Sequence, residues 1–262
     1  MSDAEKSHGV VCASTGNHGQ GVAWAGRALG VRVTVCVPAG ANPEKLIAMR
    51  DLGADIVESG PDYDAAVAKM LDIEREQHMT SVHGVNHPMM PVGAGTMTLE
   101  IVEQCKAIGV TLDTLIVAIG GGSQAVGAMT VLRKLSPNTR VIGVQTTGAP
   151  AQHHAWKTGQ RLIGPPVTTF ADGLATRNAY DLTFDALRQG LSDFILVTDT
   201  QIASAMRLMM RATHNLTEPA GSAGLAAAIA LSEHLTGQTI AIVNCGSNVD
   251  TTTLRRVICE DI

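Results

Sequence analysis

Short apolar or β-branched runs alternate with longer segments in which apolar positions recur at helical spacing. The run 31–37 is typical, because its side chains alternate, several are β-branched, and Pro38 ends it. Asn42, Pro43 and Glu44 then supply a capping side chain, a proline at the first helical position and an acid in the first turn. This alternation predicts an α/β fold with mostly parallel strands.

The same criteria divide the chain into two predicted open, twisted sheet domains. Predicted strands cover 9–13, 31–37, 55–59, 80–83, 115–119, 140–144, 194–197 and 239–244. Predicted helices follow the first loop, cover 42–52, 63–77, 96–108, 151–157, 200–213 and 221–234, and include one that ends at Leu135 and one capped by Asp250, with Asp199 as the expected cap of 200–213. The segment 84–95 has prolines, glycines and no clear period, so the domains are predicted as 9–86 and 87–262.

Composition excludes several classes of protein. Of 262 residues, 45% are hydrophobic and 16% charged, the net charge is -5, and no basic stripe is present, which argues against a nucleic-acid partner. The polar start lacks the apolar core of a signal peptide, and no apolar run is long enough to cross a bilayer. The five cysteines are odd in number and far apart, so we expect reduced thiols and a cytoplasmic location.

A first candidate ligand loop is the run Ser14-Thr15-Gly16-Asn17-His18-Gly19-Gln20, between a predicted strand and a predicted helix. Backbone N–H groups at a helix N-terminus bind anions, and glycine lets the chain approach a ligand closely. Taken alone, such a loop is more often a tight turn without a ligand.

A second loop, Gly120-Gly121-Gly122-Ser123, has two interpretations. The spacing of Gly120, Gly122 and Ala125 after a strand also fits a dinucleotide-binding turn, which predicts an acid at the end of the next strand. That strand ends at Val144-Gln145, without an acid. Successive glycines and a serine favour a cup of N–H groups around a single phosphate.

Taken together with three further motifs, these loops resemble the pyridoxal-phosphate enzymes of the serine/threonine dehydratase and serine racemase family. The further motifs are Ala171-Asp172-Gly173-Leu174-Ala175, Glu218-Pro219-Ala220-Gly221-Ser222-Ala223-Gly224 and Asn244-Cys245-Gly246-Ser247-Asn248. The resemblance runs from Gly9 to about Val257, in order. It implies fold type II, similar to the tryptophan synthase β chain, and pyridoxal 5′-phosphate as cofactor.

The resemblance also implies roles for individual residues. By it, Asn17 bonds the 3′-oxygen of the cofactor ring, Cys245 lies against the ring nitrogen and Glu218 lies near the cofactor. The implied phosphate-binding residues are Gly120, Gly121, Gly122 and Ser123, with a weaker assignment for Gln124. The implied residues of the substrate carboxylate pocket are Ser14, Thr15, Gly16 and His18. Two plainer interpretations stay open: Cys245 as a small buried residue at a strand end, and His18 as a helix N-terminal histidine without a titrating role.

The chain departs from the family pattern at the catalytic lysine. Family members carry it in a segment like Ser-Phe-Lys ahead of the first loop, and here Lys6 alone precedes that loop, in a segment that does not match. The other lysines fall on predicted helices and are interpreted as solvated; they are Lys45, Lys69, Lys106, Lys134 and Lys157. The catalytic base therefore stays unidentified, and we expect a fold that is incomplete at its N-terminus.

Two smaller departures concern racemisation and metal binding. Racemases of the family have a serine where Thr15 stands, so racemisation is not favoured. Members that bind a divalent cation have acids where Gln145 and Ala151 stand, so no metal is expected there. His153 and His154 are adjacent on a predicted helix and point apart.

The resemblance implies α,β-elimination of a small hydroxy amino acid, L-threonine or L-serine, to a 2-oxo acid and ammonia. A thiol beside the ring nitrogen, unlike a carboxylate, leaves that nitrogen unprotonated, which suits elimination better than transamination. Two alternatives remain open: a protein of the same fold that binds pyridoxal phosphate or another phosphate compound without turnover, and an amino-acid racemase. If a leading segment lies outside these residues or comes from another chain, this chain should expose apolar surface. A homodimer or higher homo-oligomer is the default expectation.

Overall fold

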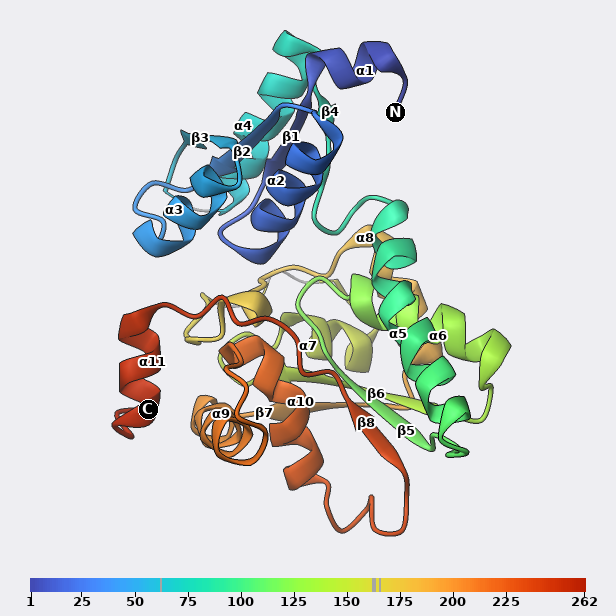
Figure 1. Ribbon diagram of the computed structural model, residues 1–262. Coiled ribbons are helices and arrows are strands. Elements are labelled where there is room, and N and C mark those ends of the chain that lie inside the picture. Colours follow the sequence, from blue (N-terminus) through green and yellow to red (C-terminus); the bar gives the residue numbers. More distant parts are fainter. Residues whose placement is uncertain (62, 162–163, 165) are drawn as a thin grey trace. The chain divides into compact units, whose positions relative to one another are not determined.

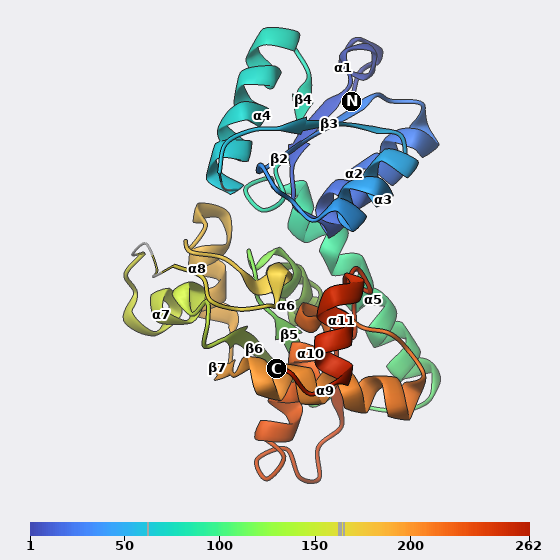
Figure 2. The same ribbon diagram turned by 90° about the vertical axis from the view of Figure 1, so that its left-hand side faces the viewer.

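The computed structural model describes residues 1–61, 63–161, 164 and 166–262. The chain forms two compact units, Met1–His87 and Pro88–Ile262. Each unit contains a parallel sheet with helices on both faces (Figures 1 and 2). The predicted α/β fold with parallel sheets is therefore confirmed.

Unit 1 is built on a sheet with the strand order β3-β2-β1-β4. Its strands are β1 (Val10–Ala13), β2 (Val33–Val37), β3 (Ala54–Glu58) and β4 (Thr80–Ser81), and its helices are α1 (Asp3–His8), α2 (Asn17–Leu29), α3 (Pro43–Asp51) and α4 (Tyr63–Gln77). One face of the sheet packs against α2 and α3 through Ala23 and Met49, and the other packs against α4 through Met70. Both faces of the strands are covered, which explains their nearly continuous apolar character.

Unit 2 repeats this arrangement with the strand order β7-β6-β5-β8. Its strands are β5 (Thr114–Ala118), β6 (Arg140–Thr146), β7 (Asp193–Val197) and β8 (Ile240–Ile242). Its helices are α5 (Met89–Ala107), α6 (Ser123–Leu135), α7 (Ala151–Thr158), α8 (Asp181–Gly190), α9 (Asp199–Thr213), α10 (Pro219–Ala230) and α11 (Thr251–Ile258), with a short 3₁₀ turn at Asp172–Leu174. Helices α5, α6 and α8 line one core cluster, and α9 and α10 line the other.

Several helix starts form as the sequence predicts. The Asn42 side chain accepts a hydrogen bond from the N–H of Glu44 at 2.9 Å, with Pro43 at the first helical position. Asp250 caps α11 by accepting from the N–H of Thr253 at 2.8 Å. These local signals suffice because each cap satisfies a donor that the helix itself leaves unpaired.

The helix predicted from position 96 begins earlier, at Met89. The segment that looked irregular is helical because it packs closely against α6, where Gly95 of α5 meets Gly127 of α6. A Cβ placed at Gly127 would lie 2.4 Å from Pro91 O and 2.7 Å from Gly95 N. Close packing of the two backbones therefore overrides the low helix propensity of these glycines.

Three other expectations were wrong or incomplete. Helices α1 and α8 were not predicted, although Thr183 and Leu187 of α8 are both buried at helical spacing.

The cap of α9 is Thr198, which forms a capping box with Gln201. Asp199 is instead the first helical residue, and its carboxylate turns toward the preceding loops. Helix α10 covers Pro219–Ala230, not 221–234, because Pro219 occupies its first turn.

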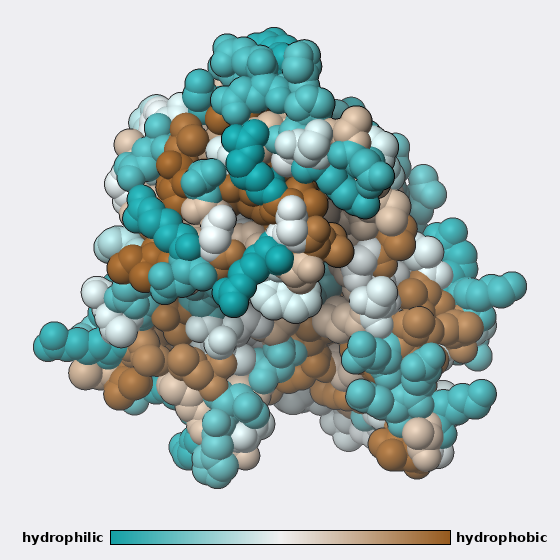
Figure 3. Space-filling view, turned by 45° about the horizontal axis from the view of Figure 1, so that its top comes forward, coloured by the Kyte–Doolittle hydropathy of each residue, from teal (hydrophilic) through white to brown (hydrophobic). Residues whose placement is uncertain are grey.

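Apolar side chains are found at the surface among hydrophilic ones (Figure 3). Large exposed examples in unit 2 include Val92, Ile108, Leu135, Ile229 and Ile258. No helix within the described ranges is both long and apolar enough to pass through a bilayer.

Candidate cofactor site

The glycine loop that follows β5 approaches its surroundings too closely for any side chain. A Cβ at Gly120 would lie 2.3 Å from Gly173 O, and one at Gly122 would lie 2.8 Å from Leu187 Cδ1. Gly122 also has a φ of +91°, which favours glycine. The glycines are therefore required by the geometry of this strand-to-helix turn.

The carbonyl oxygens of this loop are held by side chains from three surrounding segments. Gln152 Nε2 donates to Gly120 O at 3.2 Å, and Thr176 Oγ1 donates to the same oxygen at 3.4 Å. Thr183 Oγ1 donates to Gly121 O at 2.7 Å. In a planar trans peptide the N–H points away from the C=O, so the N–H groups of Gly121 and Gly122 face the opposite side.

These N–H groups fit a phosphate. In the part of the chain that the structure describes, no protein acceptor is recorded for the N–H groups of Gly121, Gly122, Ser123 or Gln124. Ser123 and Gln124 lie in the first turn of α6, where backbone donors lack partners within the helix. Successive donors at a helix N-terminus suit an anion such as the phosphate of pyridoxal phosphate.

Three further segments meet at the same edge of the sheet. Gly173 lies against Gly120, and a Cβ at Gly173 would lie 2.7 Å from Ala220 Cβ and 3.8 Å from Glu218 Oε1. The buried Glu218 accepts from the N–H of Asn248 at 3.2 Å, and its own N–H donates to Gly246 O at 2.9 Å. The motifs at 171–175, 218–224 and 244–248 are therefore brought together with the glycine loop.

Cys245 is a half-buried thiol that follows β8. Burial raises its pKa, a hydrogen bond from the Gln124 side chain opposes that rise, and the nearby Glu218 carboxylate adds to it. The thiol therefore stays protonated near neutral pH. A neutral thiol at this position fits the role implied for a partner of the cofactor ring nitrogen.

The asparagine loop lies in unit 1, after β1. The buried Ser14 hydroxyl accepts from the N–H of Gly16 at 3.1 Å and from the N–H of Gly19 at 2.9 Å. Thr15 and Asn17 are exposed at this turn. The Ser14 oxygen therefore holds the loop together, and the side chains on either side of Gly16 are presented to solvent.

His18 is anchored within unit 1. Its Nε2 lies 2.9 Å from Val82 O, and its ring packs against Gly84. Burial lowers the pKa of His18, and the bond to Val82 opposes that shift. The ring therefore connects the asparagine loop to the segment that follows β4.

The lysines are less uniform than the sequence suggested. Lys6, Lys106, Lys134 and Lys157 are exposed. Lys45 is only 7% exposed, so its interpretation as solvated was wrong. Lys69 is half-buried, and its ammonium opposes the rise that burial causes in the pKa of Cys36. Position on a helix did not reveal which helix face each lysine occupies.

The positions considered for a metal carry other contacts. Gln145 is buried, accepts from the N–H of His153 at 3.1 Å and donates to Thr176 at 3.4 Å. His153 packs edge-on against Phe194. Across the described residues, no group of three or more histidines, cysteines or acids could hold a metal ion.

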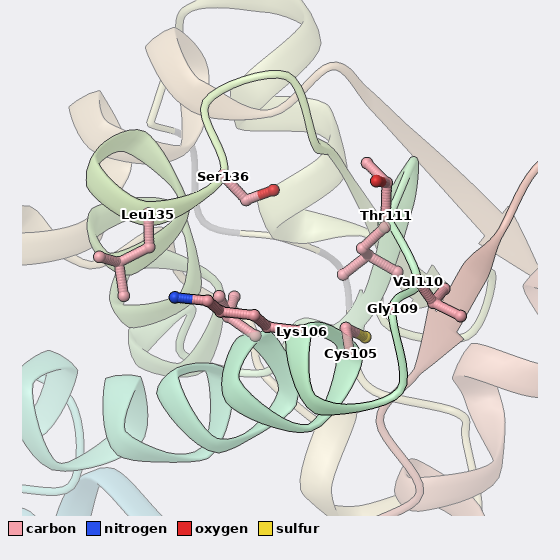
Figure 4. A pocket seen from close by; sticks show the side chains of 9 residues that line it. Cys105, Lys106, Gly109, Val110, Thr111, Leu135 and Ser136 are labelled. Atoms are coloured by element: carbon pink, nitrogen blue, oxygen red, sulfur yellow. The ribbon is translucent and has the colours of Figure 1, made fainter.

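A cavity of about 310 Å³ lies elsewhere in unit 2 (Figure 4). Lys106 of α5, Thr111 and Ser136 line it, at the edge where β5 and β6 begin. The glycine loop and Cys245 lie at the opposite edge, where strands end and where open parallel sheets bind ligands. This cavity is therefore not part of the candidate cofactor site.

Sequence reasoning missed the residues that hold the site in place. Gln152 and Thr183 anchor the glycine loop, and Asp199 accepts from Thr146, Thr169 and the N–H of Phe170 at 2.8, 2.6 and 3.0 Å. A sequence pattern could have indicated two of them, because Gln152 and Thr183 are polar residues at helical positions whose spacing predicts burial. Gln152 and Thr183 are both buried.

A family model described as "Pyridoxal-phosphate dependent enzyme" matches residues 2–246. The chain is 34% identical over 251 residues to the "L-threonine ammonia-lyase" of Geobacter sulfurreducens, covering 95% of this chain and 61% of that protein. It is 33% identical to the "L-threonine dehydratase biosynthetic IlvA" of Escherichia coli, covering 98% of this chain and 50% of that one. The chain thus spans between about half and two thirds of the length of these relatives.

Solved structures give the same fold. The processed form of threonine deaminase isoform 2 from Solanum lycopersicum aligns with a TM-score of 0.91 at 30% identity, covering 98% of this chain and 74% of that one. Maize serine racemase aligns with a TM-score of 0.90 at 28% identity, covering 100% and 79%. The fold type II assignment and the pyridoxal-phosphate cofactor are confirmed at the level of the family.

Proposed function

The chain belongs to the family of pyridoxal-phosphate-dependent enzymes. From that premise we propose that it functions as an ammonia-lyase that acts on L-threonine or L-serine. The reaction removes the α-proton and the β-hydroxyl of the amino acid, and hydrolysis then gives a 2-oxo acid and ammonia. Pyridoxal phosphate, when bound, supplies the electron sink that makes the α-proton acidic. Relatives named for threonine ammonia-lyase and dehydratase activity support this class of reaction.

The observation that carries the proposal is the orientation of the glycine loop. Gln152, Thr176 and Thr183 bond the carbonyl oxygens of Gly120 and Gly121, so the loop presents N–H groups to a phosphate without rearrangement. Ser123 lies at the start of α6 and would add its N–H and hydroxyl. A preorganised cup lowers the cost of binding because the donors are already aligned.

Each remaining site residue has one proposed task. Cys245 would hold a proton at Sγ beside the ring nitrogen, and Glu218 would keep the loop at Gly246 in place through its bonds to that segment. Asn17 would bond the 3′-oxygen of the ring. Thr15, Gly16 and His18, with Ser14 behind them, would bind the substrate carboxylate.

The proposal assigns no lysine of this chain as the base that removes the α-proton. None of the six lysines in these residues lies in a segment like that of the family, and a second candidate function is therefore kept beside the first. In that alternative the chain binds pyridoxal phosphate without turnover. A racemase is less favoured, because Thr15 stands where racemases have serine.

The location and assembly of the protein are also proposals. The five cysteines that the structure describes are free, in keeping with a reducing compartment such as the cytoplasm. We propose a homodimer or larger homo-oligomer.

Borohydride reduction of the chain with pyridoxal phosphate, followed by peptide mass mapping, tests the proposal. A pyridoxyl group on one lysine would identify the base, and release of 2-oxo acid from L-threonine or L-serine would then be measured with that lysine changed to alanine. Reversible binding without a specific adduct would favour the non-catalytic alternative. Tight binding of NAD in place of pyridoxal phosphate would reject the cofactor assignment.

A further inference from the structure

The Gln124 side chain faces two sulfur atoms. Its Nε2 lies 3.8 Å from Cys245 Sγ and 3.7 Å from Met97 Sδ. Gln124 belongs to the first turn of α6 and Met97 to α5, and Cys245 lies three residues after the end of β8. One amide therefore connects three segments at the edge of the sheet where the candidate cofactor site lies.

The chemistry of the three side chains determines which of them donates a hydrogen bond and which accepts. An amide nitrogen carries two hydrogens, so it can donate to both sulfurs at once. The thioether of Met97 can only accept, and its contact keeps the amide from rotating away. When the Cys245 sulfur accepts a hydrogen from Gln124, its own S–H hydrogen is left to point elsewhere.

We propose that Gln124 is a positioning residue that acts through Cys245, orienting the thiol so that its S–H stays available to the cofactor ring nitrogen. The identity of that acceptor rests on the proposed function, whereas the contact between Gln124 and Cys245 does not. This role differs from phosphate binding, in which only the backbone N–H of Gln124 takes part.

The electrostatics of the site agree with this role. Burial raises the pKa of Cys245, and the Glu218 carboxylate adds to the rise, while the Gln124 amide opposes both. The Gln124 amide thus makes the pKa of Cys245 lower than it would be in the same site without the amide. Its loss should make Cys245 a weaker acid and a less reactive thiol.

The test is the rate at which iodoacetamide alkylates Cys245 in the ligand-free chain, followed by peptide mass spectrometry from about pH 7 to about pH 10. Gln124→Leu keeps the size of the side chain but removes the donor. We expect the rate at a given pH to fall about fivefold, corresponding to one net hydrogen bond, and the pH profile to move upward. Met97→Leu removes the second contact of the amide and keeps the one to Cys245, so we expect a smaller fall in the same direction, below about twofold. The exposed Cys259 serves as an internal reference.

A Gln124→Leu profile that superimposes on wild type would overturn the proposal. Gln124→Glu is the second variant: its carboxylate disfavours the thiolate, so the rate should fall further, and a faster reaction would contradict the proposal. Binding of pyridoxal phosphate is measured separately. Slower alkylation in a chain that binds no pyridoxal phosphate rejects the cofactor assignment, whereas unchanged alkylation in a chain that binds it rejects the role of Gln124 alone.

Discussion

The two units share one strand order and hold their candidate ligand loops by opposite means. In each sheet the loop follows the strand at which the order reverses, β1 in unit 1 and β5 in unit 2. In unit 1 the Ser14 hydroxyl lies inside the loop and accepts from its N–H groups. In unit 2 side chains outside the loop donate to its carbonyl oxygens.

This difference separates two kinds of binding surface built on one topology. The loop of unit 1 uses the N–H groups of Gly16 and Gly19 internally, so a ligand there would be met mainly by side chains such as Thr15 and Asn17. The loop of unit 2 leaves N–H groups available to a ligand and has no room for a side chain at Gly120 or Gly122. An anion with several oxygens suits the second arrangement.

The largest expected effect comes from placing a side chain in the loop of unit 2. Gly122→Ala combines a φ of +91° with a Cβ 2.8 Å from Leu187 Cδ1. We expect the free energy of unfolding of unit 2 to fall by about 3 kcal/mol and pyridoxal phosphate binding to be lost. Urea unfolding and absorbance titration measure the two effects.

Gly109→Ala is the control for Gly122→Ala. Gly109 has a φ of +70° in the same unit, and a Cβ added there would meet no described atom within 4 Å. This change should cost about 1 kcal/mol, from backbone strain alone, without loss of cofactor. Equal costs for the two variants would contradict the packing argument.

The next effect concerns the support behind the loop of unit 2. Asp199→Asn removes the charge that accepts from Thr146, Thr169 and the N–H of Phe170. Hydrogen bonds to a charged group are stronger than neutral ones, so we expect a loss of about 2 kcal/mol in unfolding free energy. Hydrogen exchange should rise most in peptides that contain 169–175. The exposed Asp185→Asn is the control, and an equal effect there would rule out a specific role for Asp199.

A smaller effect compares the two loops directly. Thr183→Val removes the donor to Gly121 O, which should weaken pyridoxal phosphate binding about fivefold. Ser14→Ala removes the acceptor inside the other loop and should destabilise unit 1 by about 1 kcal/mol, with less than about twofold change in cofactor affinity. If a titration showed that Ser14→Ala weakens binding of pyridoxal phosphate more than Thr183→Val does, the proposed difference between the two loops would be contradicted.

The smallest effect is the pH dependence of unit 1. Burial lowers the pKa of His18 and of His83 below the ordinary histidine value. Below about pH 6.5 the unfolded chain therefore binds more protons than the folded one, so stability is complete above that value and is lost as the pH falls. His18→Gln keeps a donor for Val82 O and should flatten this loss in urea unfolding between about pH 7.5 and about pH 5.5. An unchanged slope would mean that His18 does not contribute.

The sequence revealed the fold and the motifs better than the contacts that support them. Caps such as Asn42 and Asp250 act over a few residues, so local patterns predict them. The early start of α5 depends on Gly127, far along the chain, and the anchoring of Gly121 depends on Thr183. The burial of Lys45 depends likewise on tertiary packing. No local pattern reports such pairings, because they form only when distant segments meet.

The most direct test of the account compares the binding of pyridoxal phosphate and of pyridoxal to the wild-type chain by equilibrium titration. If the loop after β5 is a phosphate cup, the phosphate should contribute several charge-assisted hydrogen bonds, and pyridoxal phosphate should bind at least about a hundredfold more tightly. Equal affinity for the two compounds would mean that the glycine loop does not bind the phosphate, and would contradict the central claim.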